Sequence, residues 1–273
     1  MIRTASKPYP VASFRVAIFA LAVFMPVCAW AGGPGTLPAA KTSVNASGAP
    51  PVNDDDEGDA SPLVVMNDFN RDGIPDIAQA TLPAKGHTGP ATLTMSLGQT
   101  DGSFKQVASK PIFDHAPRSI VTGDFNGDGI PDLIVGDDDG ALQLFFGDGT
   151  GNMVRKGDAA HLDSVVSIAV ADFNHDGISD IAVSDWRASA VTVFLGSGNG
   201  SFHYEESFPL RMRGTVPHLS AADFNGDGNT DLAVVYDSDD GDTFEVMLGN
   251  GHGVFTDAPE LSVVRDPNAH CAT

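Results

Sequence analysis

Short apolar runs alternate along most of the chain with stretches that are rich in Asp, Asn and Gly. Between residues 165 and 205 these runs fall at 166–170, 181–183, 191–195 and 202–204. The first run consists of small and β-branched residues and the third is bulkier, and no run repeats its apolar positions every three or four residues as a helix does. The pattern predicts an all-β chain built from units of four short strands.

Two polar elements recur in step with the apolar runs. A nine-residue motif, D-F-N-x-D-G-x-x-D, begins at Asp68, Asp124, Asp172 and Asp223, so its spacings are 124 − 68 = 56, 172 − 124 = 48 and 223 − 172 = 51 residues. A Leu-Gly or Phe-Gly pair followed by a Gly-rich turn and an apolar residue recurs at Gly98, Gly147, Gly196 and Gly249. A period near fifty is typical of a propeller blade, and one such sheet cannot cover its own faces. The sequence therefore predicts four four-stranded antiparallel sheets that stack on one another.

The nine-residue motif has the oxygen-rich spacing of a calcium loop. Carboxylate and amide oxygens alternate, and a Gly then lets the backbone turn sharply, which suits a hard cation with six to eight oxygen ligands. An EF-hand would need Glu at loop position twelve, where this chain has Gln79, Val135, Val183 and Val234. Tight turns also favour Asp, Asn and Gly, so one copy alone would be ambiguous. Three carboxylates within nine residues, repeated four times, need a cation to neutralise them.

The predicted ligands are the side chains at positions one, three, five and nine and the carbonyl at position seven, which would hold up to four structural Ca²⁺ ions. They are Asp68, Asn70, Asp72, Ile74 and Asp76 in the first loop, Asp124, Asn126, Asp128, Ile130 and Asp132 in the second, Asp172, Asn174, Asp176, Ile178 and Asp180 in the third, and Asp223, Asn225, Asp227, Asn229 and Asp231 in the fourth. His175 lies at a non-ligand position of the third loop and is expected to face solvent.

These motifs resemble the FG-GAP repeat, also called the VCBS-type repeat, which occurs in the propellers of integrin α-subunits and in many secreted bacterial proteins. The resemblance covers residues 62 to 258 and includes D-[LI]-[AI]-V after three of the four loops. It implies a β-propeller whose calcium loops join the first and second strands of each blade. The family's propellers usually have seven blades, whereas this chain supplies four. We expect a compact four-bladed toroid, with the tail 261–264 or the segment before Asp68 completing a terminal blade. An open arc, and an assembly closed by a second chain, are the alternatives.

The blades are expected at about 62–115, 116–164, 165–215 and 216–265, followed by a tail at 266–273. The first 31 residues carry basic residues, no acid and an apolar run at 16–27, which predicts a secretory signal peptide cleaved after Ala31. That run is too short to span a membrane. Lipid modification of Cys28 is the weaker alternative. Residues 32–61 have almost no large apolar side chain and are expected to be a flexible linker. Because the signal peptide directs export, the mature protein is expected to be extracellular or periplasmic.

The chain is strongly acidic, with 36 Asp and Glu against 15 Lys and Arg. This balance argues against nucleic acid and anionic membranes as partners. Cleavage after Ala31 would remove one of the two cysteines and leave Cys271 without a partner in the same chain.

The predicted function is that of a binding or adhesion module rather than an enzyme. No H-E-x-x-H, G-x-S-x-G or C-x-x-C motif occurs, and the carboxylates at 137–139 are better explained as a polar turn than as a glycosidase pair. A cell-surface, matrix or carbohydrate ligand would bind opposite the calcium loops, near the turn that carries Trp186 and Arg187. Packing of Trp186 between blades is an equal alternative. The competing functions are a polysaccharide hydrolase or lyase, its lectin-like accessory domain, and a scaffold that stores or senses calcium.

Overall fold

A computed structural model describes residues 44–45, 62–82, 89–112, 115–210, 216–237, 243–258 and 263–264. All regular elements in these ranges are β-strands, and no helix in them could cross a membrane. The expected signal peptide, Cys28, Cys271, most of the linker and most of the long first-blade loop lie outside the described residues.

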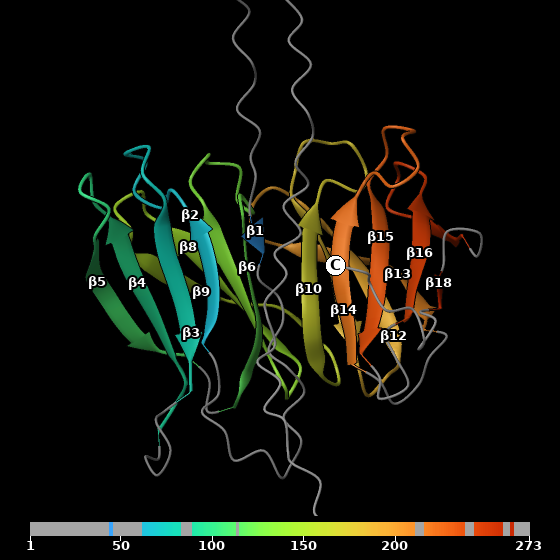
Figure 1. Cartoon of the computed structure of the whole chain (residues 1–273), viewed down its shortest axis with the longest axis horizontal. Coiled ribbons are helices and arrows are strands. Elements are labelled where there is room, and N and C mark those ends of the chain that lie inside the picture. Colours follow the sequence, from blue (N-terminus) through green and yellow to red (C-terminus); the bar gives the residue numbers. More distant parts are fainter. Residues whose placement is uncertain are drawn as a thin grey trace, which may run out of the picture. The chain divides into compact units, whose positions relative to one another are not determined.

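The strands form four antiparallel sheets, which we call blades one to four (Figure 1). Blade one contains β2 (Leu63–Asn67), β3 (Asp76–Thr81), β4 (Thr92–Gly98) and β5 (Phe104–Pro111). Blade two contains β6 (Pro117–Gly123), β7 (Asp132–Asp137), β8 (Ala141–Gly147) and β9 (Met153–His161). Blade three contains β10 (Val165–Ala171), β11 (Asp180–Asp185), β12 (Ala190–Gly196) and β13 (Phe202–Pro209). Blade four contains β14 (Val216–Ala222), β15 (Asp231–Asp237), β16 (Thr243–Gly249) and β17 (Phe255–Asp257). Within each blade, every strand pairs with the strand that follows it in the sequence.

Two very short strands extend the terminal blades. β1 (Val44–Asn45) pairs with β2, inside the segment that was expected to be a linker. The free edge of β2 presents unpaired backbone groups that any extended segment can satisfy, so apolar composition is not needed there. β18 (Val263–Val264) pairs with the first half of β16, and β17 pairs with its second half, so the tail completes the outer strand of blade four.

Three hydrophobic cores hold the four blades together, one between each consecutive pair. The first strands β2, β6, β10 and β14 follow one another through the centre of Figure 1, and each packs on the next. The central strands β7 and β11 are buried at every position, because a neighbouring blade covers each of their faces. β3 instead alternates buried and partly buried residues, because blade one has a neighbour on one face only.

A single joint recurs at the three boundaries between blades. The Phe at position two of each nine-residue motif, which we call the loop Phe, packs against the first residue of the outer strand of the next blade. The ring centroids are 5.7 Å apart for Phe125 and Phe202 and 5.4 Å apart for Phe173 and Phe255, both edge to face. Phe69 and Met153 share the core between blades one and two. Burying each Phe removes more than 150 Å² of apolar surface from water, so these joints supply much of the stacking energy.

The four blades form an open propeller rather than the expected closed toroid. Among the described strands, no packing like that between neighbouring first strands joins blade four to blade one. Phe224, the loop Phe of blade four, is 43% exposed, whereas its three counterparts are at most 1% exposed. The nine-residue motif is the same in all four blades, so this difference arises because no fifth blade follows in the described chain.

Candidate metal centres

The four D-F-N loops connect the first and second strands of their blades and share one backbone conformation. Position six is Gly with a positive φ in each loop, as expected. Position four is also left-handed: φ is 77° and 79° at Gly127 and Gly226, but 64° at Arg71 and 60° at His175. A non-Gly residue in this region pays a conformational cost, so the loop geometry is imposed by other contacts. The residue types at position four, which include Arg71 and His175, do not predict this second turn.

In the first loop the predicted ligand side chains hold the backbone in place. The two carboxylate oxygens of Asp68 accept the N–H groups of Asp72 and Gly73 at 3.0 and 2.8 Å. Asn70 Oδ1 accepts the N–H of Asp72 at 3.0 Å, and Asp72 Oδ1 accepts that of Ile74 at 2.8 Å. In the other three loops, the N–H of position five likewise donates to the side chain of position three, and the N–H of position seven donates to that of position five. These Asx turns wrap each loop around its own carboxylates.

The position-nine carboxylate is fully buried in every loop and ties the loop to the third strand. In blade two, Asp132 Oδ2 accepts the N–H of Phe125 at 3.0 Å and Oδ1 accepts that of Gly147 at 2.9 Å. Gly98, Gly196 and Gly249 donate in the same way to their own position-nine Asp at 2.8 Å. A Cβ on Gly147 would lie 2.4 Å from the carbonyl oxygen of Pro131, closer than any real contact. The recurring Leu-Gly or Phe-Gly pair is therefore part of the loop's support, a role that the sequence signalled only by repetition.

Burial raises the pKa of two of these carboxyls well above the ordinary value. Desolvation by burial and, to a smaller extent, the negative charges of Asp128 and Asp124 raise the pKa of Asp132 to about 6, against the lowering effect of two backbone N–H groups. The pKa of Asp180 is raised to about 6 for the same reasons. No ion pair to Lys or Arg involves a loop carboxylate in the described part of the chain. Each loop thus concentrates negative charge that its protein surroundings leave uncompensated.

The chemistry of this donor set suits a hard divalent cation. Within the described ranges, no three His, Cys, Asp or Glu side chains converge as a ready metal-binding group, because the carboxylates turn onto the loop backbone. Most of these oxygens keep a lone pair beside the hydrogen bond that they accept, whereas Asp76 Oδ2 and Asp223 Oδ1 each accept two N–H groups. Asp and Asn oxygens are the ligands that Ca²⁺ prefers, and bound Ca²⁺ would supply the missing positive charge. The residues that would hold it are those at the five predicted positions.

Comparison with known protein families agrees with the repeats. A family model described as "FG-GAP-like repeat" matches residues 68–135, 124–183 and 172–234, and each match runs from one loop to the strand that follows the next loop. The chain belongs to the FG-GAP-like repeat family. No curated protein matches it at a significant level. The FG-GAP-like repeats account for the four loops, the Gly that supports each one, and the open propeller of antiparallel sheets.

Adjacent FG-GAP-like loops also contact one another. His175 Nε2 lies 3.0 Å from Asn229 Oδ1, which joins position four of the third loop to position seven of the fourth. His175 is exposed, as expected, but this contact gives it a role at the boundary between blades. This contact helps to offset the conformational cost of the left-handed backbone at His175.

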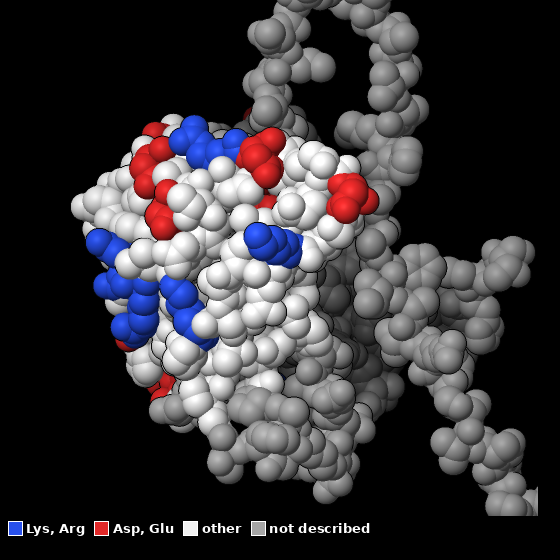
Figure 2. Space-filling model, turned by 90° about the vertical axis from the view of Figure 1, so that its left-hand side faces the viewer, with Lys and Arg blue, Asp and Glu red and all other residues white. Residues whose placement is uncertain are grey.

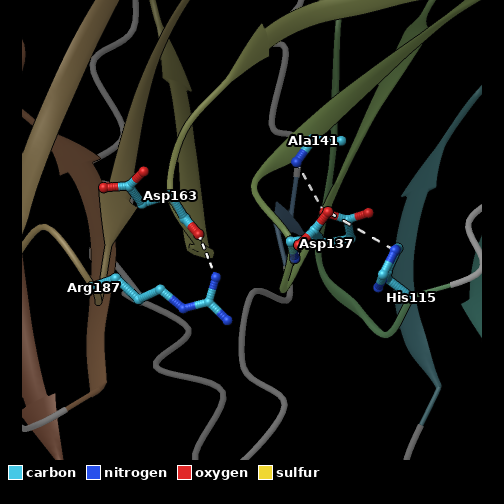
Figure 3. A network of polar contacts seen from close by, with 6 residues as sticks. His115, Asp137, Ala141, Asp163 and Arg187 are labelled. Atoms are coloured by element: carbon cyan, nitrogen blue, oxygen red, sulfur yellow. Dashed lines mark hydrogen bonds and ion pairs between the residues drawn. The ribbon is translucent and has the colours of Figure 1, made fainter.

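At the opposite end of the blades, the turn between β11 and β12 presents an aromatic side chain. Trp186 is 48% exposed, so it does not pack between blades. Buried Asp185 accepts the N–H groups of Asp163 and Ala188, at 2.9 and 2.8 Å. Arg187 Nη1 donates to the carbonyl oxygen of Asp163 at 2.8 Å (Figure 3). The turn is therefore held on both sides of Trp186.

The three consecutive carboxylates of blade two occupy the equivalent turn. Buried Asp137 Oδ1 accepts the N–H groups at positions 139 and 141, the latter at 2.9 Å (Figure 3). Asp138 lies 3.5 Å from Arg118, and Asp139 lies 3.8 Å from His115. All three therefore have partners in the turn or at the neighbouring start of β6, which agrees with the polar-turn interpretation.

Basic side chains gather on one side of this acidic chain, over the outer edges of the first two blades (Figure 2). β5 carries Lys105 and Lys110, and β9 carries Arg155 and Lys156. Lys110 Nζ donates to the Asn152 side chain at 3.1 Å and to the carbonyl of Met153, so it links blade one to blade two. Arg155 pairs with Asp158 at 2.7 Å, and Lys156 lies 4.9 Å from the ring centroid of Phe146. Three of the four side chains thus have structural partners.

Proposed function

We propose that this FG-GAP-like protein is a secreted, calcium-stabilised propeller that binds an extracellular ligand and catalyses no reaction. The chain's FG-GAP-like repeats, which are typical of binding and adhesion modules, are the starting point. The observation that supports ligand binding is the turn between β11 and β12. It presents an exposed Trp next to an Arg, and the buried Asp185 carboxylate holds its backbone in place.

The loops and this turn have different roles in the proposal. The loops are structural: at the millimolar calcium of extracellular media, a site of typical affinity adds roughly 1 kcal/mol, and four sites add about 4 kcal/mol. That is a large fraction of the 5 to 15 kcal/mol by which a domain is typically stable. Calcium would thus keep the blades rigid, and the opposite end would present the ligand-binding turn.

The ligand class that suits this turn is carbohydrate on a cell surface or in a matrix. An indole face offers a flat apolar platform with a polar edge, and Arg offers a fork of donors to hydroxyl or carboxylate groups. Trp and Arg are also the residues most enriched in binding hot spots. The exposed Trp186 and its neighbour Arg187 would therefore supply most of the binding energy.

The test is retention of the purified protein on a glycan array and on cells, with added Ca²⁺ and with chelator. We expect retention with Ca²⁺, its loss in chelator, and its loss in Trp186→Ala. Tyr204→Ala is the matched control, because Tyr204 is an equally accessible aromatic side chain, 62% exposed, on the outer strand of the same blade. Retention that survives Trp186→Ala would exclude this turn as the binding site. Turnover of the bound polysaccharide would show that the protein is a hydrolase or lyase rather than a binding module.

A further inference from the structure

The two ends of the open propeller carry complementary halves of the joint that connects its blades. Besides the Phe contact, this joint includes a hydrogen bond. The loop Phe carbonyl accepts the N–H of the turn Gly in the next blade, at 2.8 Å for Phe125 and Gly200 and at 2.9 Å for Phe173 and Gly253. At these two boundaries, between blades two and three and between blades three and four, the joint thus consists of an aromatic contact and a backbone hydrogen bond, both made at the start of the next blade's outer strand.

The same turn Gly also receives a side chain from the preceding blade. A Cβ on Gly151 would lie 2.5 Å from Leu97, one on Gly200 would lie 2.3 Å from Phe146, and one on Gly253 would lie 2.9 Å from Leu195. The side chain that packs on the turn Gly is in each case the one before the Gly that ends the third strand of the preceding blade. Close packing of a large side chain on Gly completes the joint, because any Cβ there would force the blades apart.

Blade four presents the donor half of this joint, and no strand in the described part of the chain supplies its receiver. Phe224 is 43% exposed, Val235 and Phe244 are each 38% exposed, and Leu248, the counterpart of Leu195, is only partly buried. Large apolar side chains are therefore grouped on one face of blade four. On the same face, Ala233 and Val246 are buried together with Ala258, so the exposed apolar side chains lie beside a covered centre. Exposed apolar side chains grouped in this way mark an interaction surface.

Blade one presents the receiving half without a donor. Phe104, the counterpart of Phe202 and Phe255, is 48% exposed. A Cβ on Gly102, the counterpart of Gly200, would meet no atom within 4 Å, so the space that Phe146 fills at the internal joint is open here. The blade-one face is more polar than its counterparts, with Gln79 where Val135 stands in blade two and Ser96 where Phe145 stands.

We propose that blade four of one copy stacks on blade one of a second copy, head to tail, through this joint. Phe224 would pack on the partner's Phe104, and Leu248 would pack over the partner's Gly102. The internal joints of this chain pack the counterparts of these two halves together, which is why we take a second copy as the occupant. Because Gln79 and Ser96 reduce the apolar area, association should be weaker than an internal joint and depend on concentration. Such a heterologous contact closes a ring if its rotation permits, and otherwise continues as a chain of copies.

Sedimentation velocity across micromolar concentrations, with Ca²⁺ present, tests this proposal. We expect reversible association of the purified protein, and Phe224→Asp should weaken it by at least about 30-fold, as for a hot-spot residue. Val154→Asp is the matched control, because Val154 is 49% exposed on an outer strand and belongs to neither half of the joint. A protein that stays monomeric at every concentration would overturn the proposal. Loss of folding stability in a monomeric Phe224→Asp would show instead that the chain covers its own blade-four face.

Cysteine cross-linking tests the direction of the contact. In a background with Cys28→Ser and Cys271→Ser, we expect Phe104→Cys and Phe224→Cys proteins to form a disulfide-linked heterodimer when mixed, while each alone stays uncross-linked. Cross-linking of Phe224→Cys with itself would indicate a two-fold, blade-four to blade-four contact and would refute the head-to-tail joint. This test is independent of any ligand, so it can fail while the proposed carbohydrate binding holds.

Discussion

The loop Phe provides a direct measure of how open the propeller is. Phe173 and Phe224 occupy the same motif position, but Phe173 is 1% exposed and lies edge to face with Phe255, whereas Phe224 is 43% exposed. Replacing Phe173 by Ala removes a fully buried ring and leaves a cavity, which costs about 3 to 5 kcal/mol. Replacing Phe224 by Ala removes a ring that already contacts water and leaves no enclosed cavity, so about 1 kcal/mol is expected. The predicted difference is about 2 to 4 kcal/mol.

The assay is equilibrium unfolding in urea, followed by circular dichroism, at constant Ca²⁺ and at the lowest usable protein concentration. Low concentration matters, because the proposed head-to-tail contact would bury Phe224 when copies associate. Phe125→Ala serves as a second internal reference and should behave like Phe173→Ala. Equal costs for Phe173→Ala and Phe224→Ala in dilute protein would refute the reasoning. Such a result would mean that Phe224 is buried in solution and that the arc closes on itself.

Three further results are expected. Gly147→Ala should destabilise the fold by about 2 kcal/mol or more, because the new Cβ would clash with the Pro131 carbonyl oxygen. Gly102→Ala has open space around it and should cost only about 1 kcal/mol, from the strain of a left-handed backbone. Chemical unfolding measures the free energy of unfolding of both variants. Burial raises the pKa of Asp137 above 3.8, so folding costs more with this group ionised than with it protonated, and its charge lowers stability at neutral pH. Asp137→Asn should therefore stabilise the protein at pH 7 by up to about 1 kcal/mol, and thermal melts below about pH 4 should show no gain, because the carboxyl is then protonated in the unfolded chain as well. Removing calcium should lower the melting temperature by roughly 10 °C if four sites each contribute about 1 kcal/mol, and scanning calorimetry that gives the same temperature in EDTA and in Ca²⁺ would contradict the structural role of the loops.

The repeat in the sequence was sufficient to determine the blades and the loops. A nine-residue motif, its spacing and the apolar runs between its copies are local signals, so each unit of four antiparallel strands could be predicted from its own residues. The Asp and Asn positions that line each loop were likewise readable, because hydrogen bonding within nine residues depends little on the rest of the chain. Gln79 stands where the next two blades have Val135 and Val183, on the face of blade one that no other described blade covers.

The tertiary structure decided what the identical motifs could not distinguish. Phe173 and Phe224 follow the same local rules, yet one is buried and the other exposed, because burial depends on whether another blade stacks on that face. The support of each position-nine Asp by a Gly some twenty residues away, as between Asp76 and Gly98, likewise needs the third strand to be placed beside the loop. Side chains within a repeat are set by short-range contacts, whereas closure of the ring depends on the sum of small rotations between blades. That sum is a property of the whole array, so it cannot be predicted from the sequence of any one repeat.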